Sequence, residues 1–337
     1  MGRQIGMVFD LNKCVGCQTC SVACKVLWTN DGNGRQDMWW CTVNTRPGRG
    51  TPRDWEKMGG GYDSSGKLQL GALPTPEEFG LGGEFDWEEV YRSATRKHLH
   101  PKRSETSWAM NWDEDQGDGA YPNAYFFYLP RICNHCSRPA CVEACPNGAM
   151  YKREDFGIVL RDETACRGTE QCARACPYKK IYLNQVEKIS QHCIGCFPRL
   201  EKGVAPACVR QCPGRAVFIG YRDDKESPIH KLVDSWKIAL PLHPQFNVEP
   251  NVFYVPPLSP FVVRPDGTID ESRRRIPLET LRSLFGTGVA DALKKLESEM
   301  AARRRGELSE LMDVLIGYQW KDFLGPFDRD PAEIIWD

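Results

Sequence analysis

The sequence predicts an α+β protein with two bacterial-ferredoxin-like modules built on four cysteine groups, a long irregular insert and a helical C-terminal region. Three observations lead to this prediction. Fifteen of the sixteen cysteines fall into four tight groups. Short strand-like runs follow the Cys-Pro ends of three groups and form an internal repeat. Apolar residues return at helical spacing from residue 277 onward.

The individual elements follow from local patterns. Alternating or short apolar runs predict strands, and apolar positions that recur every three or four residues predict helices. The predicted strands cover residues 4–9, 125–129, two short segments within 149–160, 180–183 and 216–220. The predicted helices cover residues 20–27 and, near the C-terminus, 278–285, 293–300 and 308–315.

The chain divides into four predicted parts. Residues 1–24 together with 186–240 should form module A, and residues 133–185 should form module B. Residues 25–132 form an insert rich in Trp, Gly and Pro, with sparse regular structure. It is read as a wrapping loop region, part of which can also serve as a subunit interface. Residues 241–337 should be an extended surface segment followed by helices.

Composition limits the classes of partner. The chain carries 44 Lys and Arg against 45 Asp and Glu, so we expect no nucleic-acid partner held by bulk charge. No stretch of about 18 apolar residues occurs, so we expect no direct membrane span. The N-terminal residues lack an apolar region and a cleavage site, so we expect no signal peptide on this chain.

The cysteine spacings are typical of bacterial iron–sulfur ligation, in which closely spaced cysteines end in x3-Cys, often before Pro. In such a run three thiolates surround one cluster, and the fourth Cys ligates the other cluster of a two-cluster module. Cys145 and Cys166 are only 21 residues apart, so the second and third groups should pair. The first and fourth groups then pair across the insert.

This pairing predicts four thiol sets, three for [4Fe–4S] clusters and one for a [3Fe–4S] cluster. The first set is Cys14, Cys17, Cys20 and Cys212; the second is Cys24, Cys193, Cys196 and Cys208; the third is Cys133, Cys136, Cys141 and Cys176; the fourth is Cys145, Cys166 and Cys172.

The fourth set lacks one thiol because Thr169 stands where the spacing requires a cysteine. A neutral hydroxyl is a poor iron ligand beside thiolates, so this set suits a cluster without the fourth iron. Cys41 is left over, and we expect it to be a small buried apolar residue.

Other metal and redox chemistry fits less well. A disulfide framework is typical of small secreted chains, and this chain is long, with 41% hydrophobic residues. Structural zinc prefers two separated pairs of ligands. No residues suggest a catalytic nucleophile or a nucleotide-binding loop. A free-standing iron–sulfur enzyme would need a cluster with an open iron, whereas each predicted [4Fe–4S] cluster has four thiols.

Several residues near the cysteines could adjust cluster potentials. His135 lies inside the second group and His192 precedes Cys193. A hydrogen bond from either would raise a cluster potential, and a plain loop role is equally compatible with the sequence. Lys179 and Lys180 would favour reduction of any cluster that they face.

The chain resembles the electron-transfer beta subunits of the nitrate reductase branch of the dimethyl sulfoxide reductase family. Besides the cysteine groups, the resemblance rests on four motifs: residues 10–14 (DLNKC), 111–115 (NWDED), 128–136 (YLPRICNHC) and 249–257 (EPNVFYVPP). It implies three [4Fe–4S] clusters, one [3Fe–4S] cluster and the crossed ligand pairing. In nitrate reductases of this branch Trp stands at the position of Thr169, so the position remains without a thiol.

The resemblance also implies partners. A catalytic alpha subunit would carry a molybdenum bis-pterin cofactor and its own iron–sulfur cluster, and a gamma subunit would carry haem b. The first set should face the alpha subunit and the fourth set the haem. The chain is compact, like the periplasmic ethylbenzene and dimethyl sulfide dehydrogenases and the selenate, chlorate and perchlorate reductases. We therefore expect a periplasmic location, reached by export with the alpha subunit. The alternative is a beta subunit of a cytoplasm-facing nitrate reductase.

Overall fold

The computed structural model describes residues 3–35, 37–79 and 117–334. Part of the insert, including the 111–115 motif, lies outside the described residues. No helix in the described ranges is long and apolar enough to cross a membrane.

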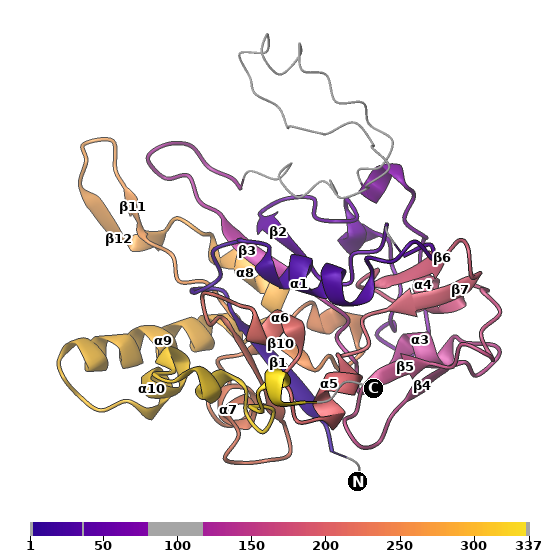
Figure 1. The fold of residues 1–337 in the computed structure, drawn as a ribbon. Helices are drawn as coiled ribbons and strands as arrows, with labels where there is room; N and C mark the ends of the chain where they lie inside the picture. Colours follow the sequence, from indigo (N-terminus) through magenta and orange to yellow (C-terminus); the bar gives the residue numbers. More distant parts are fainter. Residues whose placement is uncertain (1–2, 36, 80–116, 335–337) are drawn as a thin grey trace, which may run out of the picture.

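A four-stranded sheet lies at the centre of the molecule (Figure 1). Its order is β8 (Val217–Tyr221), β1 (Ile5–Asp10), β10 (Val252–Val255) and β9 (Leu240–Pro241). β1 pairs in antiparallel fashion with β8 and in parallel with β10. Every residue of β1 is buried, because strands cover both of its edges and packed layers cover both of its faces.

β10 corrects the expectation of a surface segment over residues 241–277. All four of its residues are buried, and Phe9 of β1 stacks on Tyr254 with ring centroids 5.7 Å apart. Its apolar run is typical of a strand buried on both faces. The prolines on either side of the run concealed this pattern in the sequence, because proline is uncommon inside sheets.

Within the described residues, four two-stranded sheets surround the central one. The strands pair in antiparallel fashion as β2 (Thr42–Arg46) with β3 (Phe127–Arg131), β4 (Met150–Lys152) with β5 (Val159–Arg161), β6 (Ile181–Asn184) with β7 (Ile189–His192), and β11 (Phe261–Val263) with β12 (Ile269–Arg274). The β2–β3 pair joins the two ends of the insert. The β6–β7 hairpin crosses the boundary predicted at residue 185, and the division into modules remains a prediction.

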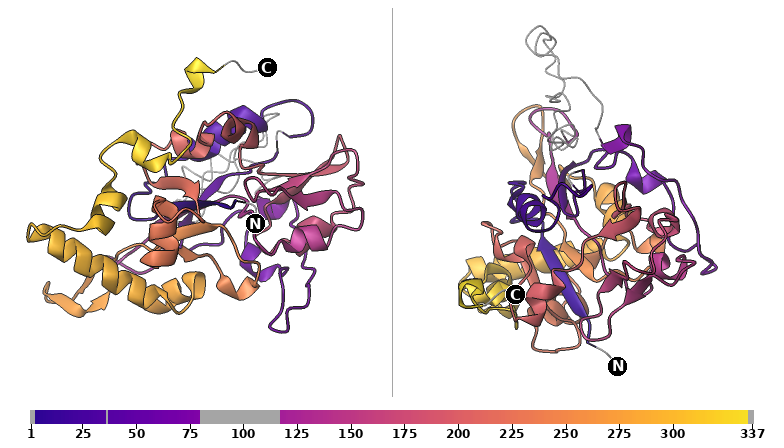
Figure 2. Two further views of the ribbon diagram at one scale, coloured as in Figure 1. Left: turned by 90° about the horizontal axis from the view of Figure 1, so that it is seen from below. Right: turned by 45° about the vertical axis from the view of Figure 1, so that its right-hand side comes forward.

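In the described ranges, the α-helices other than α1 are short near the cysteines, and the longest helix lies near the C-terminus. The α-helices are α1 (Thr19–Trp28), α3 (Ala140–Glu143), α4 (Gln171–Ala175), α5 (Phe197–Glu201), α6 (Ala207–Arg210), α7 (Pro228–His230), α8 (Leu278–Phe285), α9 (Val289–Arg304) and α10 (Glu310–Ile316). α9 and α10 lie on the opposite side of the central sheet from the β4–β5 and β6–β7 hairpins (Figures 1 and 2). The three predicted C-terminal helices are therefore present, with shifted ends.

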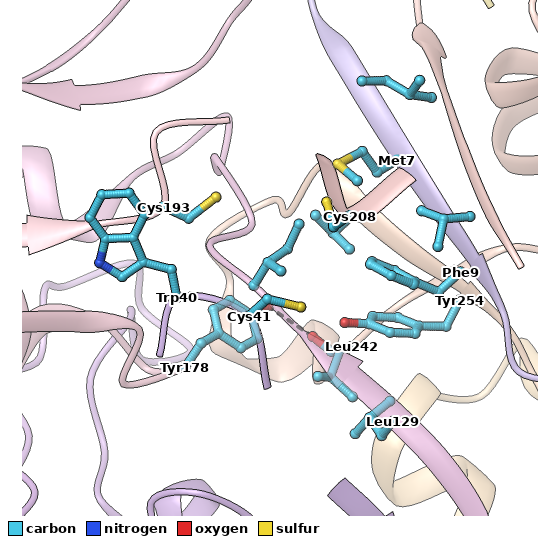
Figure 3. Packing of buried hydrophobic residues seen from close by; sticks show 14 of the residues in the cluster. Met7, Phe9, Trp40, Cys41, Leu129, Tyr178, Cys193, Cys208, Leu242 and Tyr254 are labelled. Carbon is cyan, nitrogen blue, oxygen red and sulfur yellow. Dashed lines mark hydrogen bonds between the residues drawn. The ribbon is translucent and has the colours of Figure 1, made fainter. Parts of the chain in front are cut away.

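The main core packs against the sheet and contains several of the sulfur atoms. Figure 3 shows Cys41, Cys193 and Cys208 among the apolar side chains of this core. The Tyr178 hydroxyl donates to the carbonyl of Leu242 at 2.8 Å, which satisfies a polar group inside the core. The thiols thus lie in a largely dry environment.

A buried ion network attaches the insert to the rest of the chain. Glu56 accepts hydrogen bonds from Arg46 at 2.9 Å and from His243 at 2.6 Å. Burial alone would raise the pKa of Glu56, but the His243 hydrogen bond and the Arg46 charge outweigh it and lower the pKa to about 2. Glu56 is therefore ionised in the folded protein and links two distant segments.

Candidate iron–sulfur centres

One backbone conformation recurs in the cysteine loops. The residue two positions after the leading Cys has a positive φ in all four groups: 66° at Gly16, 42° at His135, 63° at Gly168 and 63° at Gly195. This left-handed turn lets the chain curl so that successive side chains point inward, and glycine adopts it most easily. A Cβ on Gly16 would lie 2.5 Å from the Tyr128 ring, so space also requires glycine there.

The loops of the first and third groups match in further detail. Gln18 and Glu170 have φ values of 60° and 56°, and each precedes a helix. The backbone N–H groups of Cys14 and Cys166 donate to the carbonyls of Asp10 and Asp162, four residues earlier in each case. Thr169 occupies the loop position that corresponds to Cys17, and its side chain is exposed.

The first thiol set surrounds a cavity with an empty volume of about 380 Å³. All four of its cysteines line this cavity, together with apolar residues such as Phe9 and Val217. Cys17 is exposed, so the cavity reaches the molecular surface.

The second and third sets surround two further cavities. The second cavity has an empty volume of about 380 Å³ and is lined by Cys24, Cys193, Cys196 and Cys208. The third has an empty volume of about 410 Å³ and is lined by Cys133, Cys136, Cys141 and Cys176. Each predicted set of four therefore converges on a single space.

The structure also brings the three members of the fourth set together. Cys172 interacts electrostatically with Cys145 and Cys166. Ser190 lies between two of these thiols, with its hydroxyl 3.3 Å from Cys172 Sγ and its N–H 3.5 Å from Cys166 Sγ.

Cysteines four residues apart, in or just after a helix, belong to neighbouring sets. Cys20 and Cys24 are one turn apart on α1, and they line the first and second cavities respectively. α6 packs on α1, and the order there is reversed: Cys208 in α6 lines the second cavity, and Cys212, just after the end of α6, lines the first. One helical turn is about 5.4 Å, so neighbouring sets lie close together.

Electrostatic interactions between thiols of different sets give the sets a linear order. Cys20 of the first set interacts with Cys208 of the second. Cys193 of the second set interacts with Cys133 of the third. Cys141 of the third set interacts with Cys172 of the fourth. The four sets therefore form a row from the first to the fourth.

Buried thiols in the first, second and fourth sets favour their neutral form unless a cation is bound. Burial raises the pKa of Cys14 and Cys193 to about 12 and that of Cys172 to about 11. Bound iron supplies the positive charge that stabilises the thiolates. Within the described residues, no three Cys, His, Asp or Glu side chains converge as a site for a single metal ion. Thiols spread around a cavity fit a polynuclear cluster better than zinc, whose Zn–S bonds are about 2.3 Å long.

Both histidines near the cysteines are buried and neutral. Burial lowers the pKa of His192 to about 4 and that of His135 well below its usual value. His135 Nδ1 accepts a hydrogen bond from the Val159 N–H at 3.1 Å, and His192 Nδ1 donates to the Cys193 carbonyl at 2.7 Å. His192 also lines the third cavity.

Cys41 is buried as expected, but it is also close to two sets. Its sulfur lies 3.9 Å from the Ser21 hydroxyl, and its thiol interacts with that of Cys20. Cys41 also lines the second cavity. Cys41 is therefore more than a buried apolar residue, because it lies beside both the first and the second set.

Sequence reasoning missed two hydrogen-bonding partners of the thiols. The indole N–H of Trp28 donates to Cys196 Sγ at 3.1 Å. Trp28 lies four residues after Cys24 on α1, so helical spacing could have placed it beside that thiol. No sequence pattern indicated Ser190, because only the folding of the β6–β7 hairpin places it beside the fourth set.

A row of thiol sets, three of them around cavities, defines an iron–sulfur protein of the electron-transfer class. Residues 124–222 match the 4Fe-4S dicluster domain family. The selenate reductase subunit beta of Thauera selenatis is 52% identical to the chain over 96% of this chain and 99% of its own length. The chlorate reductase subunit beta of Ideonella dechloratans is 53% identical over the same shares. The dimethylsulfide dehydrogenase subunit beta of Rhodovulum sulfidophilum is 51% identical over 94% of this chain and 97% of its own.

The chain belongs to the family of iron–sulfur beta subunits that includes these proteins and the beta subunits of perchlorate and nitrate reductases. It is a non-catalytic, iron–sulfur electron-transfer subunit of an oxidoreductase complex. Iron–sulfur clusters held by these thiols would supply one-electron transfer. The protein supplies the thiol ligands, the cavities and the hydrogen bonds around them.

Proposed function

We propose that the four thiol sets hold three [4Fe–4S] clusters and one [3Fe–4S] cluster, which carry electrons in single file through the subunit. The row of sets from Cys17 at the surface to Cys166 supports this most directly. Each set of four thiols lines one cavity, and α1 carries one cysteine of the first set and one of the second.

The matching loops support a [3Fe–4S] cluster in the fourth set. Thr169 takes the position of Cys17 between two residues with the same backbone conformation as their counterparts. The loop therefore presents a hydroxyl where the first set presents a thiol, and the fourth iron has no thiolate there.

The ends of the row suggest where the partners bind. The first set opens to the surface at Cys17 and faces the catalytic alpha subunit, which carries the molybdenum bis-pterin cofactor and its own iron–sulfur cluster. The fourth set faces a gamma subunit with haem b. The complex is periplasmic, and the beta subunit is exported together with the alpha subunit. Fractionation of cells that express the complete complex tests the location, because an assembled complex in the cytoplasm contradicts it.

A free-standing iron–sulfur enzyme is the competing function. It would need a substrate cavity beside a cluster. A wide groove with an empty volume of about 2080 Å³ does lie between β12, α8 and α9, but no cysteine lines it. The subunit purified alone should therefore be brown and should turn over no substrate.

Iron analysis and low-temperature EPR of the purified complex test the cluster assignment. The oxidised complex should show a [3Fe–4S] signal, and reduction should reveal three [4Fe–4S] centres from this subunit. Replacement of Cys172 by Ser should remove the [3Fe–4S] signal, whereas Cys41→Ser, the matched control, should retain every centre. Four reducible [4Fe–4S] centres and no [3Fe–4S] signal would contradict the proposal.

A further inference from the structure

Lys180 is a buried cation between the second and third thiol sets. Its side chain is 1% exposed, although it lies just before β6 at the end of the Cys-Pro loop. Nζ donates to the Trp39 carbonyl at 3.0 Å, to the Thr42 hydroxyl at 3.2 Å and to the Tyr182 hydroxyl at 3.3 Å. All three acceptors are uncharged.

The groups that favour the charged form of Lys180 are cysteine thiols. Lys180 lines the third cavity. It also interacts electrostatically with Cys24 and Cys193 of the second set, and with Cys41 between the first and second. The other charged group that acts on it is a second buried cation, Arg131, which opposes its charge. No carboxylate is among the groups that act on Lys180 within the described chain.

Arg131 does not supply the missing negative charge, because it is itself a buried cation. Its side chain is 2% exposed, and it donates to the carbonyls of Thr51 and Tyr178. Its guanidinium stacks on the Trp55 ring at 3.6 Å, and the acid that acts on it is Glu56, which already pairs with Arg46. The region between the sets therefore holds two buried basic side chains, and burial together with Arg131 lowers the pKa of Lys180 to about 7 before any cluster is bound.

A buried charge without a counter-charge is costly, so folded proteins usually pair it. A [4Fe–4S] core bound by four thiolates carries net negative charge, and each added electron makes it more negative. A fixed cation nearby stabilises the reduced form more than the oxidised form, and this raises the reduction potential.

We propose that Lys180 is the shared counter-cation of the second and third clusters and raises the reduction potential of both. This inference rests on the proposed cluster assignment. Lys180 raises the reduction potentials of two adjacent clusters together. The difference in potential between them therefore stays small when an electron passes from one to the other. In this role the positive charge of Lys180 acts through space, and a bound anionic cluster favours the protonated side chain.

The test is an EPR-monitored redox titration of the purified complex with Lys180→Gln. The variant keeps hydrogen-bonding groups but removes the charge. The one-electron reduction constants of the second and third clusters should each fall about tenfold, which is about 59 mV. The potentials of the first and fourth clusters provide internal controls and should stay near those of the wild type.

Variants at Thr42 separate charge from packing. Thr42→Val removes a hydrogen bond to Nζ and keeps the charge, so the four potentials should stay near wild type. Thr42→Asp places a carboxylate beside Nζ and should lower the same two potentials as Lys180→Gln. If Lys180→Gln assembles with less iron, the potentials of Thr42→Asp test whether charge at this position sets the two potentials.

The outcomes are distinct. Unchanged second and third potentials in Lys180→Gln, or an equal shift of all four, would overturn the role of Lys180 while the cluster assignment stood. If the wild type lacks four separate centres, the assignment itself fails. If both charge-altering variants lose iron, Lys180→Arg should retain it, and iron loss there too would show that side-chain shape matters rather than charge.

Discussion

Replacement of Thr169 by Cys should convert the [3Fe–4S] cluster into a [4Fe–4S] cluster. The loop is already shaped for the change, because Gly168 and Glu170 have φ values of 63° and 56°, against 66° and 60° at Gly16 and Gln18 around Cys17. A thiol at position 169 should therefore reach the cluster without backbone rearrangement.

The expected magnitude follows from this geometry. Thr169 is exposed, and surface substitutions usually change the free energy of unfolding by less than about 0.5 kcal/mol. The stability of the protein should therefore change little, while the iron content rises by one atom per chain. The [3Fe–4S] signal of the oxidised complex should disappear, and a fourth [4Fe–4S] signal should appear on reduction.

The assay combines iron analysis with EPR of the oxidised and reduced complex. Thr169→Ser is the matched control, because it keeps a hydroxyl at the same position and should keep the [3Fe–4S] signal. An intact Thr169→Cys complex with unchanged iron content and an unchanged signal would refute the idea that a missing thiol at this position determines the cluster type.

Three further outcomes are expected. Trp28→Phe removes the hydrogen bond to Cys196 and should lower the potential of the second cluster by about 40 mV, equivalent to about 1 kcal/mol, with the other centres unchanged in a redox titration. Gly168→Ala should deplete the [3Fe–4S] signal, because a Cβ there would lie 2.3 Å from a backbone carbonyl. The control Gly267→Ala, at a position that also has a positive φ but has open space around it, should leave every EPR signal unchanged. Glu56→Gln should lower stability at pH 7 by about 2 kcal/mol, allowing for its partial exposure, as measured by thermal unfolding. Because the pKa of Glu56 is lower in the folded state, the wild-type advantage should persist at higher pH and decline as the pH falls from 4.5 toward 2. An advantage that instead declined above pH 5 would point to another group.

Much of the local structure could be predicted from the sequence. β1, β6 and β8 lie within a residue or so of the predicted strands, and α1 and α8 match the predicted helices closely. These elements have clear apolar periodicity, which reports directly on a buried face. β10 was missed because its apolar run is short and lies among prolines, and its neighbours in the sheet are distant in the chain.

The sequence by itself predicted the thiol sets, because cysteine spacing is a local property of the chain. The missing thiol at Thr169 is visible in the same local spacing. Tertiary structure decided what surrounds each thiol. Trp28, Ser190 and Lys180 approach cysteines of distant segments through helix packing and hairpin pairing. Such contacts depend on how separate elements pack together, and no spacing along the chain encodes them. For that reason the sequence indicates which clusters to expect, while the order of the sets and the charges between them required the fold.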